Sequence, residues 1–105
     1  MSYYEQPVCR TRDYHYKMTL YVYPVALCGE NVQRGQPLVA TAEDTSLFRL
    51  KNQTEQLVVA LMMPYGGDCF VEMRIECDGQ YCDCDEWWAE VDTVNKRMKN
   101  KGGWV

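Results

Sequence analysis

A stripe of apolar residues at helical spacing near the C-terminus constrains the fold of this chain more than any other feature. Four large apolar residues recur at i, i+4, i+7 and i+11: Trp87, Val91, Val94 and Met98. That spacing places them along one side of an α-helix. Acids at the start of the segment and bases at its end suit the two ends of a helix dipole, and a Gly-Gly pair follows as a stop signal. These signals predict an amphipathic α-helix over residues 83–103.

Two earlier segments alternate with a period of two, which is typical of β-strands. In residues 14–23, one side of the predicted strand carries Tyr14, Tyr16, Met18, Leu20 and Val22. In residues 69–77, the apolar side carries Cys69, Val71, Met73, Ile75 and Cys77. Asp78-Gly79 then predicts a turn that brings residues 82–84 back beside this second strand. A further short strand is predicted at Leu38–Ala42.

Residues 46–63 fit two interpretations. Their leucines recur at a spacing that would suit a helix. A polar block at residues 51–56, however, separates two apolar runs, and the second run, Leu57–Leu61, is typical of a buried central strand. We favour two strands joined by the polar block.

These elements predict one domain of residues 1–105 with an α+β fold. The expected architecture is an antiparallel β-sheet of about four to six strands, with one C-terminal amphipathic α-helix packed on a face. Residues 1–13 are polar and aromatic, and are expected to form an extended N-terminal arm or an early edge strand. The chain opens without a charged and then apolar leader pattern, and its longest apolar run, Leu57–Met63, is far too short to span a membrane. We therefore expect a cytoplasmic protein.

Six cysteines are unusual for a protein of that compartment, where thiols stay reduced. Cys77, Cys82 and Cys84 cluster within eight residues. This spacing is compatible with a zinc site completed by another ligand, or with a Cys77–Cys82 disulfide. Cys69 lies roughly 26 Å from Cys77 along an extended strand, too far to share one metal ion. The interpretation we favour is that these cysteines are small buried hydrophobes. No cofactor is expected, and zinc at Cys77, Cys82 and Cys84 is the alternative.

The sequence contains no catalytic motif that would indicate an enzymatic activity. His15 is the only histidine, and no flanking pattern pairs it with Cys28 or Cys84 as a nucleophilic dyad. The sequence contains no Ser/His/Asp set, no Gly-rich phosphate loop and no HExxH motif. We expect a protein without enzymatic activity.

Charge is distributed very unevenly along the chain. Residues 1–67 hold six acids and six bases, whereas residues 68–92 hold nine acids against one base, Arg74. The last thirteen residues carry four bases and no acid, which complements the end of the predicted helix. Because the neighbouring acids would repel phosphates, direct binding of nucleic acid is not expected. Because the excess of acids lies in one continuous segment, residues 68–92, we expect these side chains to form an acidic surface of the folded protein.

An acidic surface rich in aromatic residues suits the binding of a basic protein. We expect a small non-enzymatic inhibitor or adaptor that docks on a basic, nucleic-acid-binding surface of a larger protein or nucleoprotein complex. Phage and mobile-element products that block host defence nucleases, such as the anti-CRISPR inhibitors, share this size, charge and lack of motifs. The alternatives are a solvated acidic face that only aids solubility and a zinc-stabilised structural domain. The predicted partner-binding residues are Glu72, Glu76, Asp78, Tyr81, Asp83, Asp85, Glu86 and Glu90.

Overall fold

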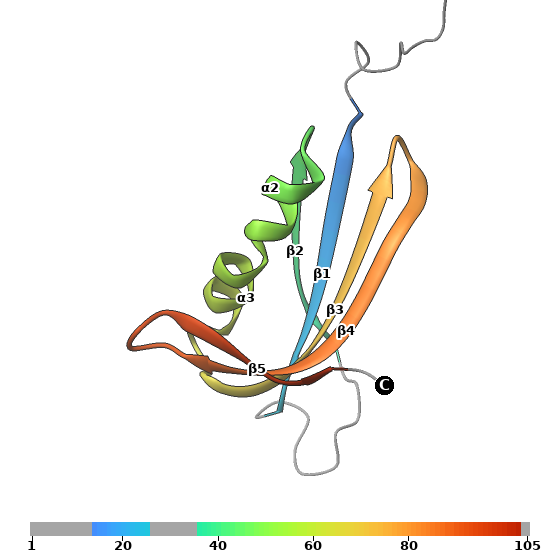
Figure 1. The fold of residues 1–105 in the computed structure, drawn as a ribbon. Helices are drawn as coiled ribbons and strands as arrows, with labels where there is room; N and C mark the ends of the chain where they lie inside the picture. The colour runs from blue at the N-terminus through green and yellow to red at the C-terminus, as the bar shows by residue number, and fades with distance from the viewer. Residues whose placement is uncertain (1–13, 26–35, 104–105) are drawn as a thin grey trace, which may run out of the picture.

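A curved antiparallel sheet with helices on one face makes up the described part of the chain, residues 14–25 and 36–103 of a computed structural model (Figure 1). Within these residues the sheet has five strands in the order β2-β1-β3-β4-β5. Their bounds are β1 Tyr16–Pro24, β2 Leu38–Asp44, β3 Gly67–Cys77, β4 Gln80–Asp92 and β5 Arg97–Gly103. Helices α2 (Leu47–Asn52) and α3 (Thr54–Met62) follow β2 and pack on one face of the sheet.

Alternation buries one side of the central strands against the helices. In β1, Met18, Leu20 and Val22 are fully buried, while the residues between them are more exposed. The register sets them beside Ile75, Met73 and Val71 of β3, so one apolar layer runs across both strands. The helices cover this layer with a buried stripe at every fourth residue: Leu50, Thr54, Val58 and Met62. The predicted strands at 14–23, 38–42 and 69–77 are thus confirmed as β1, β2 and β3.

The turn predicted at Asp78-Gly79 is also confirmed, and it joins β3 to β4. Both residues have positive φ angles, 52° and 85°, as a two-residue type I′ hairpin turn requires. Glycine adopts this backbone without steric cost, and aspartate is among the few other residues that tolerate it. The turn therefore sets the first pairs of the hairpin, Cys77 with Gln80 and Glu76 with Tyr81, and a bulge shifts the register by one residue from Ile75 onward.

The predicted C-terminal helix over residues 83–103 is wrong, because this segment is the main part of β4, a turn and β5. Spacings of four are even, so Trp87 and Val91 share a side of a strand as well as a side of a helix. Ala89 between them is also buried, which fits only the strand. Val94, the third member of the helical stripe, is 87% exposed in the turn. There the carboxylate of Asp92 accepts the N–H groups of Val94 and Asn95, which ends β4.

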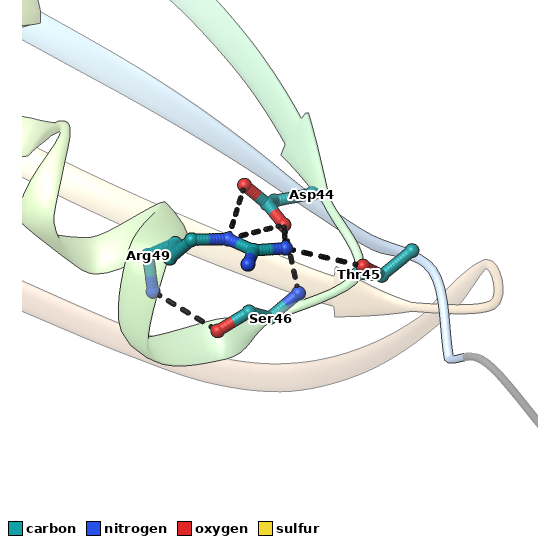
Figure 2. Close-up of polar contacts among 4 residues, drawn as sticks. All are labelled: Asp44, Thr45, Ser46 and Arg49. Carbon is teal, nitrogen blue, oxygen red and sulfur yellow. Dashed lines mark hydrogen bonds and ion pairs between the residues drawn. The ribbon is translucent and has the colours of Figure 1, made fainter.

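The preferred interpretation of residues 46–63 as two strands is wrong as well. Ser46 caps α2, since its hydroxyl accepts the N–H of Arg49 at 3.2 Å (Figure 2). Asp44 braces the same turn by accepting hydrogen bonds from the N–H of Ser46 and the guanidinium of Arg49, both at 2.9 Å. The polar block contains Gln53, where α2 ends and α3 begins. Its polar side chains lie mainly on the outer side of the helices, which is why they do not mark a loop.

The fold class is therefore a sheet-dominated α+β arrangement with its helices in the middle of the chain, not a sheet with a C-terminal helix. The β4–β5 hairpin curls under α3, so the hairpin and the helices enclose the core from two sides (Figure 1). None of the helices in the described residues has the length and apolar character to cross a membrane. The arm predicted for residues 1–13 lies outside the described residues.

Candidate functional site: the open face of the sheet

The face of the sheet opposite the helices carries rows of aromatic and charged side chains, and we call it the open face. Strand register aligns its residues in rows across β1, β3 and β4. One row consists of Tyr23, Phe70 and Trp88. The next row consists of Tyr21, Glu72 and Glu86. The open face therefore sets an aromatic row directly beside a row with two carboxylates.

The aromatic row packs ring against ring. The centroid of the Phe70 ring lies 5.0 Å from that of Trp88 in an edge-to-face arrangement and 6.4 Å from that of Tyr23. Such pairs contribute about 0.5–1.5 kcal/mol each beyond the area that they bury. Phe70 is only 1% exposed, although its side chain points away from the helices. Tyr23 and Trp88 are half-buried, so parts of both rings remain accessible.

Glu72 and Glu86 are direct cross-strand partners in the neighbouring row. Like charges placed opposite each other on one face of a sheet destabilise the pairing. The hydroxyl of Tyr23 donates a hydrogen bond to Glu72 at 2.9 Å and holds this carboxylate in place. Glu72 and Glu86 thus place two carboxyl groups beside an aromatic surface.

A guanidinium already packs on this face. The Cζ atom of Arg74 lies 5.9 Å from the centroid of the Tyr21 ring, within the range of a cation–π contact. Arg74 and Tyr21 project from β3 and β1, one row apart on the open face. The surface chemistry of the open face is therefore suited to guanidinium groups.

The open face gathers five of the eight predicted partner-binding residues: Glu72, Glu76, Tyr81, Glu86 and Glu90. Tyr81 lies beside Glu76 near the hairpin turn, is 71% exposed, and donates to the sulfur of Cys84 at 3.1 Å. Glu90 lies at the other end, opposite Asp68, whose carboxylate meets Lys101 at 3.3 Å. The carboxylates are thus spread over the length of the face, with bases among them.

The other three predicted residues lie elsewhere. Asp78 belongs to the β3–β4 turn, where its carboxylate accepts the N–H of His15 at 3.3 Å. Asp83 and Asp85 are on the helix side of β4. The ammonium of Lys51 on α2 donates to Asp83 at 2.9 Å, and this hydrogen bond lowers the pKa of the Asp83 carboxyl. The structure therefore places the four glutamates on one face of the sheet and the three aspartates elsewhere.

The aromatic row is not among the sites predicted from the sequence. Tyr23 and Phe70 alternate with the apolar sides predicted for their strands, but a helix over residues 83–103 would remove Trp88 from the sheet. The strand alternation of Trp88 with Trp87 and Ala89 was the available signal. The register set by Asp78-Gly79 alone would place Trp87 opposite Phe70; a bulge after Tyr81 shifts the pairing by one residue and aligns Trp88 with Phe70 instead.

The cysteines of the described residues are thiols that form no disulfide with one another. Cys69 is buried in β3, and burial raises the pKa of its thiol to about 11. Register places Cys77 on the helix side and Cys84 on the open face, so Cys77, Cys82 and Cys84 do not converge. Across residues 14–25 and 36–103, no group of three or more histidine, cysteine or acidic side chains is placed to hold a metal ion.

His15, the other candidate considered for chemistry, is exposed and forms an ion-pair contact with Glu43 of β2 through its Nε2 atom. Its backbone carbonyl accepts the N–H of Asp78, which ties the start of β1 to the β3–β4 turn.

No family model, curated protein or solved structure matches this chain.

Proposed function

We propose that this protein is a non-enzymatic protein-binding module that docks the open face of its sheet on a basic surface of a larger partner. The observation that carries the proposal is the carboxylate pair Glu72 and Glu86 beside the aromatic row Tyr23, Phe70 and Trp88. Tyrosine and tryptophan are the residues most enriched in the energetic centres of protein interfaces. Carboxylates around them attract a positively charged partner and speed its approach.

An arginine or lysine of the partner would bind between Glu72 and Glu86. A cation placed between these two side chains is attracted to both, and its aliphatic part can pack on the neighbouring rings. Arg74 on Tyr21 is an intramolecular example of the same chemistry. An arginine is favoured over a lysine, because a planar guanidinium stacks on aromatic rings and bonds carboxylates through two N–H groups.

The partner we propose is a protein or nucleoprotein complex whose basic surface normally grips nucleic acid. The carboxylates of the open face would take the place of phosphates and block that path. An inhibitor of the phage or mobile-element, anti-CRISPR-like type, acting in the cytoplasm, is the biological role that this mechanism fits.

The test compares two variants with the same change in net charge. Glu72→Gln/Glu86→Gln removes two charges from the open face and keeps the acceptor for Tyr23. Gln56→Lys/Ala60→Lys adds two positive charges on exposed positions of α3. The probe is an oligo-arginine peptide, titrated by calorimetry at low ionic strength and again at about 0.15 M salt.

We expect the open-face variant to bind the peptide at least about tenfold more weakly, the effect of about 1.4 kcal/mol. The α3 variant should lose much less, because its added charges lie on the other side of the molecule. Affinity of the wild type should fall with salt. Equal losses in both variants would show that only net charge matters, and would refute a specific docking face.

A further inference from the structure

In the described part of the chain, one stretch of β4 lies at a free edge of the sheet. β5 pairs with β4 only from Trp87 to Asp92. Before Trp87, the described residues provide β4 with a neighbour on one side only, β3. A bulge at Cys82 interrupts the register, so the regular part of the free edge runs over residues 83–86.

The outward N–H groups of this edge are occupied by side chains of the strand itself. The N–H of Cys84 donates to the carboxylate of Asp83 at 2.8 Å, and the N–H of Glu86 donates to that of Asp85 at 2.9 Å. Because successive N–H groups of a strand point to opposite sides, these two are the donors that an added strand would use. Charged groups at an edge discourage pairing with further strands.

A groove of about 520 Å³ runs beside this edge, between β4 and the helices. Met73, Trp87 and Met98 give it an apolar part. Of the described residues that line it, four are acids and one is a base: Glu55, Asp83, Asp85 and Glu86 against Lys51. The groove therefore suits a side chain with an aliphatic body and a positive end.

We propose that the edge of β4 from Asp83 to Glu86 binds an extended segment of a partner protein that carries lysine or arginine. The segment would add to the sheet as an antiparallel strand, with carbonyl groups that accept the N–H groups of Cys84 and Glu86. A residue opposite Asp85 would form a non-hydrogen-bonded pair with it, the pair type in which side chains approach most closely. Its basic side chain would enter the groove.

The two aspartates make the edge selective for a basic segment. An added strand would accept the N–H of Glu86, which now donates to the carboxylate of Asp85. A lysine of the added strand opposite Asp85 would give this carboxylate a charge-assisted hydrogen bond in its place. A neutral strand leaves that carboxylate without a donor in a partly enclosed groove, which is unfavourable. Asp83 keeps Lys51 as a partner in either case.

A second copy of this chain is disfavoured as the occupant. Antiparallel pairing of two β4 edges would bring Asp83 and Asp85 of both copies together, and like charges directly opposite destabilise a sheet. Charge complementarity therefore favours a basic segment over self-association.

The test uses two short peptides, one alternating threonine with lysine and one alternating threonine with glutamine. Cys84→Pro removes an edge N–H that does not serve the β3–β4 ladder, a position where a strand tolerates proline. Cys84→Ala is the matched control, since it removes the same sulfur and keeps the N–H. Binding is measured by fluorescence anisotropy of labelled peptides, with circular dichroism to verify the fold.

We expect the lysine peptide to bind the wild type and Cys84→Ala equally, and Cys84→Pro at least about tenfold more weakly. The glutamine peptide should bind the wild type more weakly than the lysine peptide. Equal binding of the lysine peptide by the folded proline and alanine variants would overturn the proposal.

Asp85→Thr keeps the proposal testable if the proline variant does not fold. This variant should lose the preference for the lysine peptide and should self-associate in light scattering, since the edge then accepts neutral strands. An unchanged preference would again overturn the proposal. Glu72→Gln changes the open face but none of the residues of the edge or the groove, so its preference for the lysine peptide should persist, which separates this edge from the open face.

Discussion

The carboxylate of Glu55 in the first turn of α3 lies 2.8 Å from the Nε atom of Arg97 at the start of β5. The same carboxylate oxygen accepts the backbone N–H of Met98, also at 2.8 Å. The Met98 hydrogen bond and then the Arg97 guanidinium lower the pKa of the Glu55 carboxyl. One side chain thus joins a helix to the last strand of the sheet, which the chain reaches only 42 residues later.

Glu55→Ala should lower the free energy of unfolding by about 1–2 kcal/mol, because a hydrogen bond to a charged group is lost together with a surface ion pair. The matched control is Asp68→Ala, which removes an exposed ion pair with Lys101. We expect that control to lose less than about 1 kcal/mol. Urea denaturation of both variants measures the difference. Equal losses would mean that the Met98 contact contributes nothing to stability.

Acid should destabilise the fold in a narrow pH range. Hydrogen bonds lower the pKa values of Asp44, Glu55, Asp83 and Asp92, the main donors being Arg49, the Met98 N–H, Lys51 and the Asn95 N–H. A lowered pKa in the folded state means that the unfolded chain binds more protons, so stability falls as pH falls. The stabilisation should be complete above the ordinary values of 3.8 for aspartate and 4.5 for glutamate.

Urea denaturation at a series of pH values tests this expectation. The free energy of unfolding should change little between pH 7 and about 5, and should then fall steadily below about 4.5. Glu55→Gln should reduce the fall, because the amide side chain does not titrate. A free energy of unfolding that stays constant down to about pH 3 would contradict the assigned hydrogen bonds.

The strands β1 and β3 could be predicted because each has one buried and one more exposed side. Met18, Leu20 and Val22 alternate with more accessible residues, and this pattern has no helical equivalent. The segment 83–103 lacked that clarity, since Trp87 and Val91 are four apart and fit both periods. Only Ala89 and Val94 distinguish the two, and both contradict the helix.

The prediction of two strands over residues 46–63 was wrong for a different reason. β-branched residues such as Val58 and Val59 favour strands locally. In the folded protein they lie on a helix that packs on the sheet, and they are buried against its apolar face. Burial by distant strands, which sequence alone does not reveal, decided the outcome. The acidic segment was visible in the sequence, but its division between the two faces of β4 depended on strand register.

Chemical modification should distinguish Cys69 from the other cysteines of the described residues. Burial raises the pKa of the Cys69 thiol to about 11, and the side chain is inaccessible in β3. With N-ethylmaleimide at about pH 8, Cys82 and Cys84 should react rapidly, because they are exposed. Cys69 should react only after the protein is unfolded in urea. Peptide mass mapping reads out each site, and rapid native labelling of Cys69 would show that β3 opens locally.

The buried indole nitrogen of Trp87 can be removed with little expected change in the free energy of unfolding. Its indole N–H has no hydrogen-bond partner among the described residues, although the side chain is only 8% exposed. An unpaired buried donor costs about 1–3 kcal/mol, so Trp87→Phe removes that cost while leaving a small cavity. The two effects oppose each other, and we expect the free energy of unfolding to stay within about 1 kcal/mol of the wild type. Trp87→Ala removes the whole ring and should cost about 3–5 kcal/mol. Urea denaturation monitored by circular dichroism compares the two, and a phenylalanine variant as unstable as the alanine variant would mean that the indole N–H is hydrogen-bonded in solution.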